Sequence, residues 1–161
     1  MSRPNANQGA YVPAGGDRFG QQRSVFGVMP FSIKVSSRDT GGGLLVIEQH
    51  NAYQGGPPRH QHLEQDEWFY VVHGDYLVEV GGNLHRLGPG DSILAPSGVP
   101  HTWALEGAAA GRILIALQPA LTMEAFFEAA SKLPAMPTSD ELRPLFEAHG
   151  MTIVGPPLRG G

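Results

Sequence analysis

The chain has 161 residues, enough for one domain whose hydrophobic core needs neither a disulfide nor a structural metal to hold it. Its net charge of −4, with Lys and Arg scattered along the chain, excludes the basic surface that nucleic-acid binding requires. It contains no cysteine, which excludes disulfides, thiolate catalysis and cysteine-based metal sites, so any metal must bind to nitrogen and oxygen atoms.

The chain divides into three parts by composition. Residues 1–22 are rich in Gly, Asn, Gln and Pro and are predicted to form a flexible arm, because they have little apolar surface to bury. Residues 23–120 should form a barrel, and residues 121–161 a helical extension that packs on it. Neither a signal peptide nor a membrane-spanning run is recognisable, so we expect a cytoplasmic protein with no membrane partner.

The barrel segment consists of short apolar runs separated by Gly, Pro, Asn and Asp, which is typical of antiparallel sandwiches and barrels. Turn sequences such as Gly74-Asp75 and Gly81-Gly82-Asn83 support this, because they tolerate the positive φ of tight hairpins. We therefore predict an all-β fold with these strands: 31–36, 44–50, 59–63, 67–73, 76–80, 84–87, 91–95, 101–105 and 111–118.

The extension has the apolar spacing of helices. Thr122 could cap a helix that runs to about Leu133, with its apolar residues on one side. Thr138 and Glu141 have the spacing of a capping box for a second helix, in which Pro144 must either cause a kink or mark the true start. The sequence thus predicts one or two C-terminal helices.

Four side chains form a candidate metal site. His60 and His62 are two residues apart on a predicted strand, so both imidazoles face the same side. Glu67 begins the next strand after a short turn, and His101 opens a later one. Three imidazoles and one carboxylate suit Fe, Ni, Mn, Co, Cu or Zn better than Mg or Ca. The other histidines, His73 among them, have no such support and are expected to be structural or to face solvent.

The neighbours of these residues suggest a pocket and an interface. Strand alternation places Phe69 on the side of Glu67, and Trp103 and Leu105 on the side of His101, so these three are candidates for an apolar substrate pocket. The opposite face of the 67–73 strand is also apolar, through Trp68, Tyr70 and Val72. It should pack on a second sheet or on another subunit, and we expect a homodimer.

The motifs resemble those of the cupin superfamily. Its first motif, His-x-His followed by Glu and then by Gly, is matched by His60, His62, Glu67 and Gly74. Its second motif, Gly, Pro, Gly and His at fixed spacing, is matched by Gly90, Pro96, Gly98 and His101. Two positions depart from the pattern, Gln54 and Leu105, and neither supplies a metal ligand in the family. The resemblance implies a single-domain, jelly-roll-like double-stranded β-helix with a divalent transition metal on His60, His62, Glu67 and His101.

The longer pattern, including Asp66-Glu67-Trp68-Phe69-Tyr70 and the tail from Gly150 to Leu158, is similar to bacterial quercetin 2,3-dioxygenase-like cupins. In that group a flavonol ring is opened with dioxygen, which implies an enolisable aromatic substrate here. The ion would keep about two open positions for substrate and dioxygen, and Glu67 would be both ligand and general base.

The sequence leaves alternatives to this hypothesis open. Glu67 could stay a fixed ligand, or the barrel could be a degenerate cupin without metal. The protein could also be a non-oxidative cupin, either a small-molecule-binding protein or an isomerase or cyclase of natural-product synthesis, because a fold shared with enzymes does not establish an activity.

Overall fold

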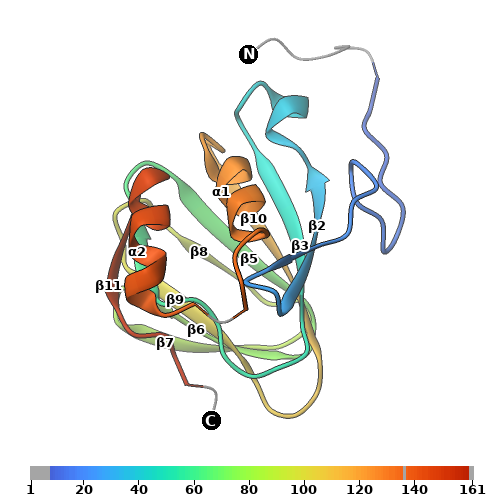
Figure 1. Ribbon diagram of the computed structural model, residues 1–161. Coiled ribbons are helices and arrows are strands. Elements are labelled where there is room, and N and C mark those ends of the chain that lie inside the picture. Colours follow the sequence, from blue (N-terminus) through green and yellow to red (C-terminus); the bar gives the residue numbers. More distant parts are fainter. Residues whose placement is uncertain (1–7, 136, 160–161) are drawn as a thin grey trace.

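The computed structural model describes residues 8–135 and 137–159, which form two antiparallel sheets and two helices (Figure 1). The larger sheet has, in spatial order, β1 (Arg23–Val25), β2 (Met29–Val35), β3 (Leu45–Asn51), β10 (Gly111–Gln118), β5 (Asp66–His73) and β8 (Ser92–Ala95). The smaller sheet has β11 (Met151–Gly155), β4 (Arg59–His62), β9 (His101–Glu106), β6 (Asp75–Val80) and β7 (Asn83–Leu87). The predicted all-β fold with C-terminal helices is confirmed.

The alternation along β5 shows how the sequence forms the core. Phe69 and Val71 point between the sheets and are fully buried, whereas Trp68, Tyr70 and Val72 alternate with them and are half-buried on the outer face. β4 and β10 repeat this alternation, and the core fills the space between the two sheets. The metal-site candidates lie on this inner side.

Two strands were not predicted. β1 is only three residues long and pairs with β2 through a tight turn at Phe26–Val28. β11 lies in the extension that was expected to be helical, and it pairs with β4, so that Met151 lies opposite His62 and Ile153 opposite His60. In the described residues β4 pairs with β9 at His60 and His101 alone, so β11 supplies most of the pairing of β4.

The two helices are α1 (Met123–Ala130) and α2 (Ser139–Ala148), and a short 3-10 helix covers Ser37–Thr40. α1 ends before the predicted Leu133, and the Thr122 side chain makes no capping hydrogen bond. α2 begins at the predicted capping box, so Pro144 lies inside the helix and does not mark its start. No helix in the described ranges is long and apolar enough to cross a membrane.

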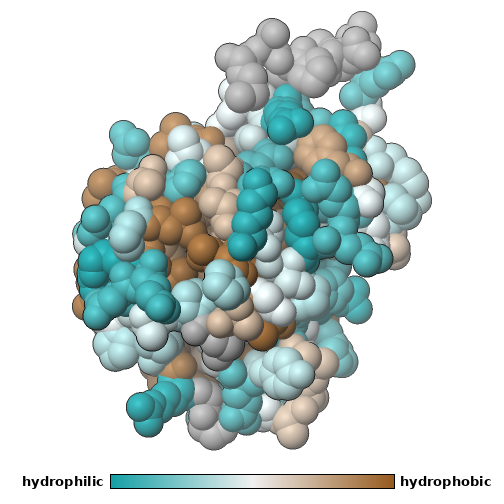
Figure 2. Space-filling model, viewed as in Figure 1, coloured by the Kyte–Doolittle hydropathy of each residue, from teal (hydrophilic) through white to brown (hydrophobic). Residues whose placement is uncertain are grey.

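Both helices lie on the same side of the barrel and contact each other (Figure 1). Phe126 and Phe127 of α1 and Phe146 of α2 are turned inward and buried. Figure 2 shows hydrophobic residues gathered over the middle of this face, with hydrophilic residues around them. The helices therefore close one side of the space between the sheets.

Part of the predicted arm is fixed to the barrel. The Asp17 carboxylate accepts a hydrogen bond from the backbone N–H of Ile33 at 2.8 Å and pairs with Arg23 at 2.9 Å. The backbone N–H of Arg18 donates to the Ile33 carbonyl at 2.7 Å. The segment around Asp17 thus lies along β2, and residues 1–7 of the expected arm are outside the described residues.

Candidate metal centre

Four buried side chains from three strands converge between the sheets. β4 supplies His60 and His62, β5 supplies Glu67 and β9 supplies His101. The turn between β4 and β5 brings Glu67 back across from the two histidines, and strand pairing places His101 opposite His60. One possible ligand atom from each residue lies within 4.8 Å of every other, so the cluster could hold one metal ion.

The carboxylate of Glu67 is the centre of the cluster. Its Oε2 lies 2.8 Å from Nε2 of His62, 2.7 Å from Nε2 of His101 and 4.0 Å from Nε2 of His60. The ring centroids of His60 and His101 are 4.6 Å apart. All three Nε2 atoms therefore face the same carboxylate oxygen.

The other ring nitrogens are held by hydrogen bonds from outside the cluster. Nδ1 of His60 lies 2.7 Å from the Pro58 carbonyl oxygen, and Nδ1 of His101 lies 3.1 Å from that of Val99. A carbonyl oxygen only accepts, so each Nδ1 must donate, and a neutral ring then carries its lone pair on Nε2. Nδ1 of His62 lies 3.2 Å from Oε1 of the buried Gln65. Such partners typically orient histidine ligands of metals.

This arrangement fits a bound cation. With Nδ1 of His101 donating to Val99, a neutral ring would direct a lone pair at Oε2 of Glu67 across 2.7 Å. Two acceptors at that distance repel each other unless a proton or a cation lies between them. The nitrogen and oxygen donors match a first-row transition metal, without deciding which one.

The charges of the cluster follow from its burial. Burial and the charge of His101 lower the pKa of His60 to about 3, against the attraction of Glu67. Burial would raise the pKa of Glu67, but His62 and His101 together hold it well below its usual range. Burial would lower the pKa of His101, but the hydrogen bond and charge of Glu67 raise it. The buried Glu67 is therefore ionised beside a neutral His60.

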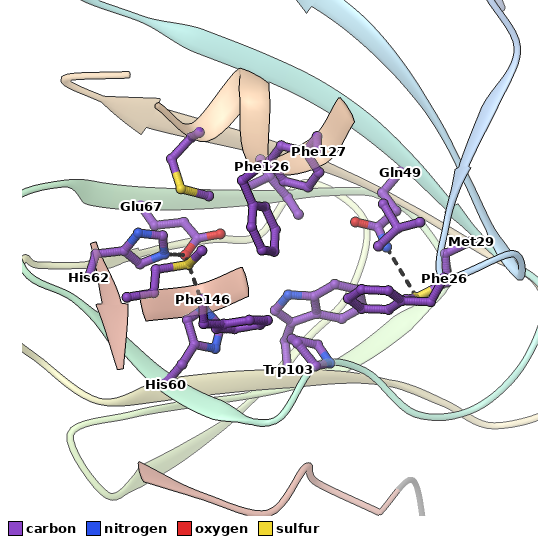
Figure 3. Close-up of a pocket in the computed structure, with 15 residues that line it drawn as sticks. Phe26, Met29, Gln49, His60, His62, Glu67, Trp103, Phe126, Phe127 and Phe146 are labelled. Carbon is purple, nitrogen blue, oxygen red and sulfur yellow. Dashed lines mark hydrogen bonds and ion pairs between the residues drawn. The ribbon is translucent and has the colours of Figure 1, made fainter. Parts of the chain in front are cut away.

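The cluster opens on a small cavity of about 50 Å³, the inner cavity. Figure 3 shows His60, His62 and Glu67 at one end of it and Gln49, Met29 and Phe26 at the other. Five aromatic side chains line it: Phe26, Trp103, Phe126, Phe127 and Phe146. The site thus combines a charged, buried ligand cluster with an apolar surround.

The three predicted pocket residues differ in position. Trp103 lines the inner cavity, 3% exposed. Phe69 lies behind the cluster, where its ring centroid is 5.9 Å from that of His101. Leu105 is buried further along β9, where its backbone N–H donates to the carbonyl of Gly55. Neither Phe69 nor Leu105 is among the residues that line the inner cavity. His73 is exposed at the end of β5 and lies outside the cluster.

Several cavity residues were not predicted. Gln49 is 3% exposed, and its Nε2 lies 3.2 Å from the sulfur of Met29. A single glutamine in an apolar strand carries no spacing signal in the sequence. The inward face of α1, with Phe126, was expected to be apolar, whereas Phe146 of α2 was not singled out. Which end of the barrel these side chains cover depends on tertiary packing.

Comparisons with known proteins agree with this fold. Residues 48–117 match the cupin domain family. The structure of KdgF from Halomonas sp. is 23% identical with a TM-score of 0.57, covering 70% of this chain and 94% of that one. A cupin-superfamily sugar phosphate isomerase from Silicibacter pomeroyi is 17% identical with a TM-score of 0.54, covering 67% and 74%. A comparison with curated proteins found no match.

An RmlC-like cupin from Shewanella frigidimarina is 22% identical with a TM-score of 0.50, covering 62% of this chain and 83% of that one. Identities this low show a shared fold. Together with the match of residues 48–117 to the cupin domain family and the two-sheet topology, they show that the chain has the cupin fold.

Proposed function

We propose that this protein is a metal-dependent dioxygenase of the quercetinase-like cupin type, acting on a flavonol, another polyphenol or a related enolisable aromatic. The observation that carries the proposal is the convergence of three Nε2 atoms on the Glu67 carboxylate at one end of an aromatic cavity. His60, His62, Glu67 and His101 would hold the ion. When bound, a divalent ion would lower the pKa of a coordinating enol or phenol and leave positions for substrate and dioxygen.

Glu67 would also act as the general base. Its contacts with the three histidines all use Oε2, so Oε1 is the oxygen that can accept a proton from a substrate hydroxyl group. Its low pKa keeps it ionised, so it carries no proton of its own. The aromatic walls would hold the substrate ring and keep bulk water from the reacting atoms.

The test is oxygen consumption. Metal-free protein is reconstituted separately with Fe, Ni, Mn, Co, Cu and Zn, and oxygen uptake is followed after a flavonol is added. We expect uptake with at least one metal and its loss in Glu67→Gln, which keeps the side-chain shape but removes the base. No uptake with any of these metals would contradict the dioxygenase.

A non-oxidative cupin is the second candidate, either a binding protein or an isomerase or cyclase. The small inner cavity favours it, because a whole flavonol exceeds about 50 Å³. One cupin with this fold is a sugar phosphate isomerase, but the described residues that line the inner cavity include no Lys or Arg to pair with a phosphate. A neutral, apolar ligand is therefore expected here too. Product formation without oxygen, or thermal stabilisation by such a ligand without turnover, would support this candidate.

A further inference from the structure

The inner cavity is too small for the proposed substrate. Its volume of about 50 Å³ compares with roughly 30 Å³ for a water molecule in the liquid and with about 300 Å³ or more for pockets that bind drug-sized molecules. An ion with one or two small ligands would fill it. An aromatic substrate must therefore use further space.

A larger hollow of about 480 Å³, the outer groove, adjoins this cavity. Phe26, Met29 and Pro57 line both spaces, so these side chains form the wall between them. Most of the groove lining is apolar and comes from the 53–58 loop, the β1–β2 turn and the start of α2, where Ser139 lies. The groove thus has the size and character of a binding site for an aromatic molecule.

Phe26 is the unusual member of the shared wall. Its φ of 53° lies in the left-handed region, which a bulky residue rarely adopts because it is strained there. Yet its side chain is only 7% exposed. It sits in the three-residue turn between β1 and β2, which is held by a hydrogen bond from the Val28 N–H to the Val25 carbonyl at 3.2 Å. A strained turn thus holds a large side chain in the wall.

Met29 and Gln49 complete this end of the cavity. Among the residues that the structure describes, the Gln49 amide donates to the Met29 sulfur alone, a weak acceptor, at 3.2 Å. If Met29 moved, Gln49 would therefore lose only a weak hydrogen bond. The N–H of Gln49 could then donate to an oxygen substituent of a ligand. Figure 3 shows Gln49 and Met29 opposite the ligand cluster, with Phe26 beside Trp103.

We infer that Phe26 and Met29 form a gate between the two spaces, and that the outer groove binds the apolar remainder of an aromatic substrate whose oxygen end reaches the ligand cluster. This inference rests on the proposed function for the identity of the substrate. Gate opening would join the two spaces into a site with room for a flavonol.

Tryptophan fluorescence can test the gate without metal or turnover. The chain has two tryptophans, so Trp68→Phe leaves Trp103 alone to report on the inner cavity. In this background we expect Phe26→Ala to raise the acrylamide quenching constant of Trp103 by about threefold or more, because access scales with the open fraction. Phe26→Gly, which suits the positive φ, should do the same. Phe19→Ala, outside both spaces, is the matched control and should leave the constant unchanged.

The groove is tested with a flavonol titrated into the same protein, with and without metal. Ser139→Phe places a ring in the outer groove and should raise the dissociation constant roughly tenfold, equivalent to about 1.4 kcal/mol, while acrylamide quenching stays the same. Asp140→Phe adds the same ring one residue along, on a side chain that is 93% exposed, and should have no effect.

Unchanged quenching in both Phe26 variants would overturn the gate, and unchanged flavonol binding in Ser139→Phe would overturn the groove. Neither measurement needs oxygen chemistry. If the protein binds a flavonol but takes up no oxygen, the dioxygenase proposal fails while the gate and the groove remain supported.

Discussion

At the scale of single residues, the cluster depends on which atom of each imidazole faces inward. Backbone carbonyls of Pro58 and Val99 hold Nδ1 of His60 and His101, so that both Nε2 atoms point to Glu67. Because a backbone position cannot rotate away as a side chain can, the ligand geometry would be fixed before any ion binds.

Removing one candidate ligand should remove the metal and keep the fold. His62→Ala is expected to lower metal affinity by more than about tenfold, since even partners outside the ligand set contribute about that much, while the circular dichroism spectrum stays that of the wild type. Elemental analysis of the dialysed protein measures occupancy. His73→Ala, on the exposed end of β5, is the control. Full occupancy in His62→Ala would refute the metal site.

The pKa of His60 predicts how the stability of the metal-free protein depends on pH. The unfolded chain takes up a proton near pH 6.5, which the folded protein does not take up until about pH 3. The contribution of His60 to the free energy of unfolding should therefore be greatest above pH 6.5 and fall as pH decreases below it, by up to about 1.4 kcal/mol per pH unit. The lowered pKa of Glu67 acts in the same direction at more acidic pH.

The measurement is urea denaturation in the presence of a chelator at pH 6 and pH 5. Folding raises the pKa of His101, so the stability that His101 contributes is present below pH 6.5, the ordinary pKa of histidine, and is lost only as pH rises above it. It therefore does not oppose the effect of His60 between pH 5 and pH 6. His60→Asn should flatten the dependence between these two values. An equal slope in wild type and variant would show that His60 does not cause it.

Residue types and spacing were enough to predict the four members of the cluster. Two histidines two apart on a strand must share a face, and the two motifs placed Glu67 and His101 with them. Gln49 and Gln65 could not be predicted, because their roles depend on which side chains tertiary packing brings next to them.

At the scale of elements, α1 is attached to the barrel by charged side chains. Glu124 accepts hydrogen bonds from the Ser36 hydroxyl at 2.8 Å, from the backbone N–H of Ser37 at 2.9 Å and from the Ser37 hydroxyl. Glu128 pairs with Arg23 of β1 at 2.9 Å. These contacts fix the helix that carries Phe126 over the inner cavity.

Glu124→Ala should therefore destabilise the fold. It removes the acceptor of the buried Ser36 and Ser37 groups, and leaving such donors without a partner costs about 1–3 kcal/mol. Urea denaturation measures the change in the free energy of unfolding. Glu147→Ala, on the exposed side of α2, should change it by less than about 0.5 kcal/mol. Equal effects in the two variants would argue against this attachment.

The positions of the strands were easier to predict than the pairing between them. All nine predicted strands are present, since alternation and turn residues are local signals. β11 was missed because its five residues follow a helical segment and gain their partner only through the pairing with β4. The attachment of α1 joins positions 88 residues apart and leaves no local trace in the sequence.

At the scale of the whole molecule, the part of the larger sheet's outer face around β5 is apolar and only half-buried. Trp68 lies between Leu94 of β8 and Ala116 of β10 on this face, and Leu94 is 51% exposed. In the described part of the chain, neither the smaller sheet nor a helix packs on this side. Of the two predicted coverings, a second subunit is the one that we propose.

Trp68→Lys should convert a homodimer into a monomer, because the lysine charge would have to be buried at the interface. Light scattering after size-exclusion chromatography gives the mass of each form. Leu84→Lys changes an exposed leucine of β7 in the other sheet and should leave the dimer intact. A monomeric wild type at all accessible concentrations would contradict the homodimer.

The position of β11 affects the order in which the protein can be completed during synthesis. β4 carries two of the candidate ligands and leaves the ribosome before β11, the strand with which it shares most of its pairing. Until then β4 has an open edge, and the nascent chain presents His60 and His62 on a strand that is only partly paired. Metal capture by a correctly formed site is thus expected only after β11 has left the ribosome and paired with β4.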